Sequence, residues 1–327
     1  QDCKSSNLCF FSNSIFSLTL LFILCLFFLP TTYLIDPPCV GCAMASIKSK
    51  SYNSKIFFIE VRENNMPQAT TEPPKMETSY LIKSDGVKIA YNKLSGGEPG
   101  IIFFGGFASD MEGTKALALQ EYAEEREQAF LRFDYRGHGK SSGSFTDGNI
   151  GKWLSDCLAV LDKLTQGCQI LVGSSMGGWL TLLTAKERPG RVGGIVGIAS
   201  APDFTEDLMW SQFDDETRKK LIKNGQCSLA SDYHESPYTI TLDLIEDGKK
   251  HLVLRKRLNI KVPCHLIHGM ADEDVPYQLS LKLAEHVDSE NVQVNIIKNG
   301  DHRLSREQDL VEILKAVDDL TAHLTKK

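Results

Sequence analysis

The chain has 327 residues, of which 24% are charged and 42% are apolar, and its formal net charge is −6. Acidic and basic residues are interspersed, and no basic patch alternates with aromatic residues, so the sequence argues against a nucleic-acid-binding protein. The length allows one large α/β domain or two smaller ones, with enough apolar residues for a sizeable core.

The N-terminal segment 1–77 is predicted to lie outside the folded domain. Residues 15–29 are almost wholly apolar, which is the length of a signal-peptide core, and the run extended to 15–35 is just long enough to cross a bilayer. Residues 44–59 are rich in Ser and Lys and contain no acidic residue, loosely as in a transit peptide. Three interpretations stay open: a membrane anchor, a cleaved targeting segment, or translated sequence that never folds. Membrane contact is expected only through 15–35.

The nine cysteines are unevenly placed, with five of them in the first 42 residues. Those in the remainder of the chain lack the spacing of a metal site or a disulfide framework; they are Cys157, Cys168, Cys227 and Cys264. We interpret them as buried free thiols of a protein in a reducing compartment.

From residue 78 onward, strand patterns alternate with helix patterns. Strands are predicted at 80–82 and 87–91 as a hairpin with a glycine turn, and then at 100–104, 128–133, 170–172, 191–198, 264–267 and 292–297. Helices are predicted at 114–125, 152–164, 179–185, 278–287 and 310–324. Such alternation predicts one α/β domain over 78–327, a mostly parallel sheet with helices on both faces. The charged, helix-rich segment 203–259 interrupts the alternation, and we interpret it as a cap inserted above the strand ends.

One turn between a strand and a helix carries the pattern of a catalytic nucleophile. Gly173–Gly177 matches G-x-S-x-G, in which the central serine stands on a strained turn with its hydroxyl clear of the sheet. The backbone amide of Met176, at the start of the helix, can then face a developing oxyanion. A second match, Gly139–Gly143, does not directly follow a strand. Context therefore favours Ser175 as the nucleophile, the structural alternative being a Gly/Ser-rich loop that merely packs tightly.

An activated serine needs a base and an acid that orients the base, and on this type of fold the chain order is Ser, acid, His. The pattern H-G-x-x-D-x-x-V-P at 268–276 places the acid at Asp272, directly after a predicted strand. Asp274 is the competing candidate and Glu273 a weaker one. The alternative to a catalytic acid is an acidic turn that caps the helix at 278–287, a role that suits Asp274.

Two histidines lie between Asp272 and the closing helix. His302 follows the last predicted strand, where a loop can reach the crevice above the sheet, whereas His286 lies on a helix and away from the strand ends. We therefore assign the base to His302. The other histidines are expected to be mostly structural or solvated; they are His138, His234, His251, His265, His268 and His323.

The oxyanion needs a second backbone amide besides that of Met176. The glycines before Phe107 let the backbone turn sharply after the strand at 100–104, which makes the amide of Phe107 the candidate. The stretch 132–141 ends like a phosphate-binding loop, but Asp134 stands where that motif needs Gly. We interpret it as a structural loop beside the site.

These motifs together resemble the serine-hydrolase branch of the α/β-hydrolase superfamily, from about residue 78 to the C-terminus. Several stretches are similar to mitochondrial palmitoyl-protein thioesterases that also act as acyl-glucuronide esterases; they are 113–118, 132–135, 151–153, 169–180, 268–276 and 301–303. The resemblance implies that Ser175, Asp272 and His302 form the catalytic triad. It also implies hydrolysis of S-palmitoyl thioesters and acyl glucuronides and, by resemblance alone, a mitochondrial location. Gly105 departs from these relatives, which usually carry His or Pro there.

The favoured function is thus a serine esterase or thioesterase that works through an acyl-enzyme without a metal or cofactor. Its expected partners are an S-acylated protein or a small acyl ester or glucuronide. A serine peptidase or amidase on the same scaffold is the first alternative, and a non-catalytic binding protein that retains the fold is the second. Anchoring in a membrane through 15–35 and a cytoplasmic location remain the alternatives to the mitochondrion.

Overall fold

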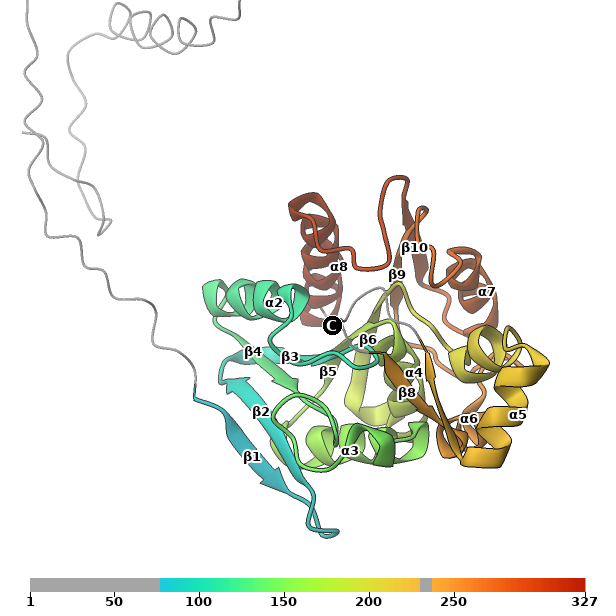
Figure 1. Ribbon diagram of the computed structural model, residues 1–327. Helices are drawn as coiled ribbons and strands as arrows, with labels where there is room; N and C mark the ends of the chain where they lie inside the picture. Colours follow the sequence, from blue (N-terminus) through green and yellow to red (C-terminus); the bar gives the residue numbers. More distant parts are fainter. Residues whose placement is uncertain (1–76, 230–236, 327) are drawn as a thin grey trace, which may run out of the picture. The chain divides into compact units, whose positions relative to one another are not determined.

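An eight-stranded sheet forms the centre of the protein in the computed structural model, which describes residues 77–229 and 237–326 (Figure 1). Its strands are β1 (Ser79–Ile82), β2 (Lys88–Leu94), β3 (Gly97–Phe104), β4 (Gln128–Phe133), β5 (Gln169–Ser174), β6 (Val192–Ile198), β9 (Cys264–Gly269) and β10 (Val292–Ile297). The strand order is β1-β2-β4-β3-β5-β6-β9-β10. The pairs β1/β2 and β2/β4 are antiparallel and all other neighbours are parallel, as the sequence predicts.

The central strands are buried on both faces of the sheet. Every residue of β5 and β6 is buried, which suits their apolar and glycine-rich sequences. Side chains along β3 alternate between two cores, because successive residues of a strand point to opposite faces. Ile101 and Phe103 belong to one core, and Ile102 and Phe104 belong to the other.

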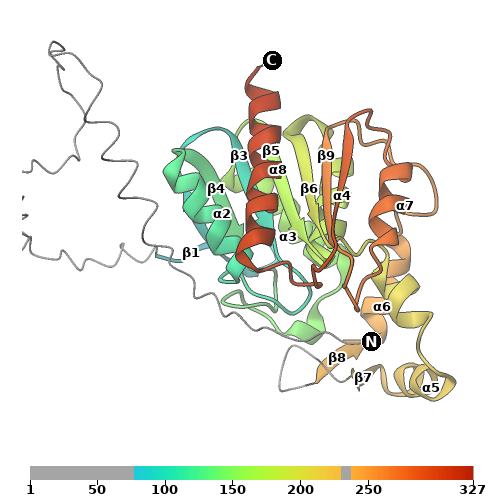
Figure 2. The same ribbon diagram turned by 90° about the horizontal axis from the view of Figure 1, so that it is seen from above.

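Helices cover both faces of this sheet. The helices α2 (Thr114–Glu125) and α8 (Glu307–Thr325) lie on one side, as Figures 1 and 2 show. Apolar residues of α3 (Ile150–Leu164), α4 (Met176–Glu187) and α7 (Gln278–His286) belong to the core on the other side. Short 3₁₀ turns, η1 (Phe145–Asp147) and η2 (Pro189–Arg191), complete this part of the chain.

The segment between β6 and β9 contains the remaining elements of the described residues. They are the π-helical η3 (Thr205–Trp210), α5 (Asp215–Asn224), β7 (Gln226–Leu229), β8 (Tyr238–Thr241), α6 (Leu242–Gly248) and the 3₁₀ turn η4 (Lys249–His251). The helices agree with the predicted helix-rich character. The antiparallel pair β7/β8 was not predicted, because each strand has only four residues and β7 contains a single large aliphatic residue, Leu229.

The four cysteines in the described residues are all free. Cys157 and Cys264 are buried as expected, whereas Cys168 and Cys227 are half-buried. Burial raises the pKa of Cys264 to about 12, which keeps this thiol protonated and unreactive.

None of the helices in the described residues has the length and apolar character needed to span a membrane. The predictions for the N-terminal segment, including the apolar run 15–35, fall outside the described residues.

Candidate active site

Ser175 stands alone between a strand and a helix. It directly follows β5 and precedes α4, and its φ of 54° and ψ of −117° are unusual for a residue with a side chain. Its amide donates to the carbonyl oxygen of Ile198 at 2.9 Å, and its carbonyl oxygen accepts from Gly178 at 2.9 Å. The surrounding backbone therefore holds the strained turn in place.

Steric contacts explain the two glycines of the pattern. A Cβ on Gly173 would lie 2.4 Å from the carbonyl oxygen of Gly177, and one on Gly177 would lie 2.1 Å from that of Phe104. Both distances are far below van der Waals contact, and the obstructing atoms belong to backbone. Only glycine lets α4 approach β3 and β5 this closely.

Three loops bring Ser175, His302 and Asp272 together. The Ser175 hydroxyl lies 3.0 Å from Nε2 of His302, and Nδ1 of His302 lies 2.8 Å from Oδ2 of Asp272. The carboxylate can only accept, so Nδ1 carries the hydrogen and Nε2 is free to accept from the serine hydroxyl. The three side chains form a continuous path for the serine proton to reach an oriented imidazole.

The carboxylate of Asp272 is held in its ionised form. Burial by itself raises the pKa of this side chain, but hydrogen bonds from His268 and His302, together with the positive charge of His302 when its ring is protonated, outweigh burial and hold the pKa well below its ordinary value. The amides of Asp274 and Val275 donate to Oδ1 at 3.0 and 2.8 Å. The acid is thus charged and oriented over the whole range in which an imidazole acts as a base.

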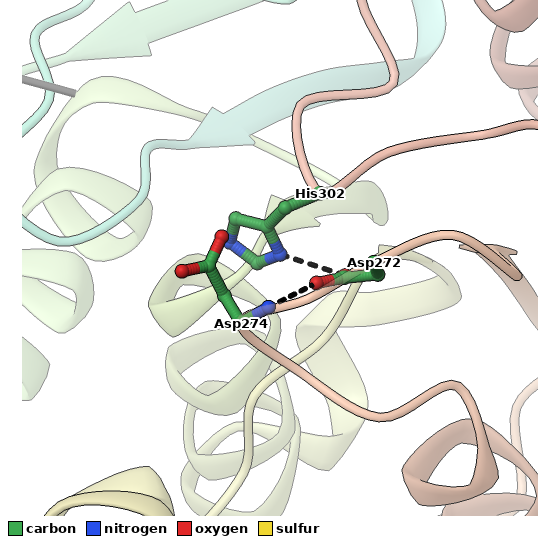
Figure 3. A group of neighbouring side chains, drawn as sticks. All are labelled: Asp272, Asp274 and His302. Atoms are coloured by element: carbon green, nitrogen blue, oxygen red, sulfur yellow. Dashed lines mark hydrogen bonds and ion pairs between the residues drawn. The ribbon is translucent and has the colours of Figure 1, made fainter. Parts of the chain in front are cut away.

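Asp274, the competing acid, lies on the other side of the imidazole from Asp272 (Figure 3). It is exposed, and its amide rather than its carboxylate contacts Asp272. Tyr277 occupies the N-cap position of α7, and its own side chain makes no capping hydrogen bond. One carboxylate oxygen from each of Asp272 and Asp274 and one ring nitrogen of His302, atoms of the kind that bind metal ions, lie within 4.8 Å of one another. A cation bound there would compete with the hydrogen bond between His302 and Asp272.

The other rejected candidates, His286 and Ser141, bind backbone groups elsewhere in the fold. Nδ1 of His286 lies 2.7 Å from the carbonyl oxygen of Lys282 in its own helix, α7. The Ser141 hydroxyl donates to the carbonyl oxygen of Asp134 at 2.7 Å and accepts from the amide of Ala90 at 2.8 Å. The second G-x-S-x-G match therefore ties a loop to β2.

The loop that carries Phe107 lies against the serine turn. A Cβ on Gly106 would lie 3.6 Å from Cβ of Ser175, so the backbone here runs beside the serine. Met176 is the first residue of α4, so its amide lies at the positive end of the helix dipole. Its side chain is fully buried. The loop that carries the Phe107 amide and the first turn of α4, which carries the Met176 amide, therefore both lie beside Ser175.

Two side chains from the loop after β4 hold the Phe107 loop. The Tyr135 hydroxyl donates to the carbonyl oxygen of Gly105 at 3.0 Å, and the amide of Ala108 donates to Nε2 of His138 at 3.2 Å. Ala108 has a φ of 54°, so these contacts stabilise a strained turn. The stretch 132–141 is thus structural, as predicted, and two of its side chains, Tyr135 and His138, contact the loop beside Ser175.

Comparison with known proteins agrees with this architecture. The model of the family described as alpha/beta hydrolase fold matches residues 99–226. The chain is 39% identical over 252 residues to the protein named Palmitoyl-protein thioesterase ABHD10, mitochondrial, of Bos taurus, covering 77% of this chain and 82% of that protein. The chain belongs to the α/β-hydrolase family.

Solved structures of related α/β hydrolases extend the comparison. A hydrolase from Agrobacterium vitis S4 superposes with a TM-score of 0.73 at 40% identity, over 76% of this chain and 99% of that one. Alpha/beta hydrolase domain-containing protein 10 from mouse gives a TM-score of 0.71 at 38% identity over the same shares.

Sequence reasoning about this α/β hydrolase missed the contribution of His268. This residue was expected to be structural or solvated, yet its Nε2 lies 3.1 Å from Oδ2 of Asp272. The available signal was its position at the end of a predicted strand, four residues before the candidate acid.

Proposed function

We propose that this α/β hydrolase is a serine thioesterase and esterase that works through an acyl-enzyme. The observation that carries the proposal is the chain of hydrogen bonds from Ser175 through His302 to Asp272. In unrelated folds the same arrangement serves nucleophilic acyl transfer. The names of the relatives support palmitoyl thioesters as substrates.

The reaction follows from the roles that the geometry allows. Oγ of Ser175 attacks the acyl carbonyl carbon while Nε2 of His302 takes the hydroxyl proton, and Asp272 stabilises the imidazolium. The amides of Phe107 and Met176 donate to the oxyanion. Collapse of the tetrahedral intermediate expels the thiolate or alkoxide, which His302 protonates. Water activated by His302 then releases the acid and restores Ser175.

We propose S-palmitoylated proteins as the substrates, together with acyl glucuronides, which are esters and pass through the same tetrahedral intermediate. The relatives' names further support a mitochondrial location. We also propose that residues 1–77 lie outside the hydrolase domain and that 203–259 forms its cap.

The test compares two serines that both occupy a G-x-S-x-G pattern. Ser175→Ala is expected to lower kcat for a palmitoyl thioester and a p-nitrophenyl ester by about 10⁴–10⁶-fold, because no other group replaces the nucleophile. It is also expected to abolish labelling by a fluorophosphonate probe. Ser141→Ala, assayed well below its unfolding temperature, is the matched control. It should retain hydrolysis of both substrates and labelling by the probe. Unchanged hydrolysis by Ser175→Ala rejects the proposal.

A peptide panel measured beside the thioesters separates the two enzyme classes. Cleavage of peptides at rates that exceed those of matched thioesters would favour a serine peptidase. A wild-type protein that neither labels nor hydrolyses any of these substrates would favour a binding protein.

A further inference from the structure

A second histidine contacts the carboxylate that orients His302. His268 ends the run of apolar residues in β9, and its side chain is fully buried. Its Nε2 lies 3.1 Å from Oδ2 of Asp272, the same oxygen that accepts from His302. We propose that His268 is a positioning residue for the acid, an inference that rests on the proposed function.

The contacts of His268 determine where its ring carries a hydrogen. Nε2 also lies 2.9 Å from the carbonyl oxygen of Val275, and both of its neighbours can only accept. Nε2 is therefore the donor, shared between the carbonyl and the carboxylate. In the neutral ring Nδ1 accepts from the Ser280 hydroxyl, whose oxygen lies 2.7 Å away. Ser280 belongs to α7 and is buried, so strand and helix together fix the ring.

His268 completes a set of four donors around Asp272. Two backbone amides donate to Oδ1, and His268 and His302 donate to Oδ2. A carboxylate with both oxygens occupied in this way cannot rotate without breaking hydrogen bonds in a buried place, which is costly. His268 thus keeps Oδ2 directed at Nδ1 of His302, and acts on the reaction only through Asp272.

The matched test uses two buried histidines of the same strand. His265 is three residues from His268 in β9, so its side chain points to the opposite face of the sheet, towards α8. His268→Phe removes the donor while keeping a ring, His268→Gln keeps an N–H that can reach Asp272, and His265→Gln is the control. The substrate is a p-nitrophenyl ester, with palmitoyl thioester as the second assay.

His268→Phe is expected to lower kcat by about 10–100-fold with little change in KM, the size typical of an outer partner that orients a functional group. His268→Gln should recover most of this loss, and His265→Gln should stay within about twofold of the wild type. Unfolding temperatures of all variants are measured in parallel, so that loss of folded protein is not read as loss of kcat.

A double-mutant cycle with Asp272→Asn decides whether His268 acts through the acid. In that background His268→Phe should change the residual hydrolysis by less than about twofold, because the group it positions is already altered. Equal losses in both backgrounds, or no loss in the wild-type background, overturn the proposal. Ser175→Ala keeps this outcome separate from the proposed function: if it abolishes hydrolysis, the enzyme class stands whatever the His268 variants show.

Discussion

His138 acts on the Phe107 loop as a neutral hydrogen-bond acceptor. Its Nε2 accepts from the amide of Ala108, and its Nδ1 lies 3.2 Å from the carbonyl oxygen of Arg136. The ring is packed among Tyr135, Phe145 and Trp153. Burial lowers the pKa of His138 to about 4, despite the opposing hydrogen bond to Arg136 and the charge of Asp156. A protonated ring has no lone pair left for Ala108, so acid weakens this anchor.

The stability of the protein should therefore depend on pH through His138. The pKa of about 4 in the folded state is below the value of 6.5 for a free histidine, so between these values the unfolded state binds more protons. The contribution of His138 to the free energy of unfolding is complete above about pH 6.5, and it falls by about 3 kcal/mol as the pH drops to about 4.

Urea unfolding of the wild type and of His138→Phe measures this contribution, because other groups titrate equally in both proteins. The difference between their free energies of unfolding is expected to shrink from about pH 7.5 to about pH 4.5. A constant difference would show that His138 does not titrate in this window.

At the scale of elements, the junction of β5 and α4 determines whether the site can form. The obstructing atoms around Gly177 are the backbone carbonyl groups of Phe104 and Gly105, at the end of β3, and cannot turn aside as a side chain can. An added methyl group must therefore shift α4 or β3. Either shift moves Ser175 relative to the loop of Phe107.

Gly177→Ala is expected to lower the free energy of unfolding by about 1–3 kcal/mol, which is the typical cost of overpacking a tight junction. It should also slow fluorophosphonate labelling by about 10²-fold, because a displacement of about 1 Å has such effects. Gly190→Ala is the matched control, since nothing lies within 4 Å of an added Cβ there. Comparable unfolding temperatures and labelling rates for the two variants would contradict the steric explanation.

Elements with a strong pattern were predictable from the sequence, and features that depend on tertiary contacts were not. The bounds predicted for 114–125 and 292–297 are those of α2 and β10. Helix α8 starts three residues before the predicted 310, at Glu307, because the first turn is set by the polar pair Arg306 and Asp309 rather than by apolar periodicity. The spacing of motifs singled out Ser175 and His302, but no local pattern shows that His268 and His302 share one oxygen of Asp272.

At the scale of the whole molecule, the segment 203–259 contacts the same loop that borders Ser175. The Phe107 ring packs edge-on against Phe204 and Tyr238 of this segment, with centroids 5.7 and 5.8 Å apart. It also packs against Phe145, with centroids 4.9 Å apart. Under the proposed function, this packing places the segment where it can influence which acyl groups reach Ser175.

Asp203 joins the beginning and the end of this segment. Its carboxylate is fully buried and accepts from the amides of Val253 and Leu254 at 2.7 and 2.9 Å. Arg255 donates to it at 3.3 Å. Burial raises the pKa of Asp203 although these donors oppose the shift, so the bonds form at the cost of desolvating a carboxylate. We infer that Asp203 favours one arrangement of the two ends of this segment.

Asp203→Asn tests whether the segment 203–259 selects the substrate. An amide replaces one acceptor oxygen with a donor, so one of the two backbone amides loses its partner, which costs about 1–3 kcal/mol. We expect kcat/KM for a palmitoyl thioester to fall by about tenfold more than that for an acetyl thioester, since only the long chain needs an ordered cap. Asp207→Asn is the control, because Asp207 contacts the same Arg255 from a more exposed position. Parallel losses on both substrates would instead show that Asp203 supports the site in general, and that chain length is recognised elsewhere.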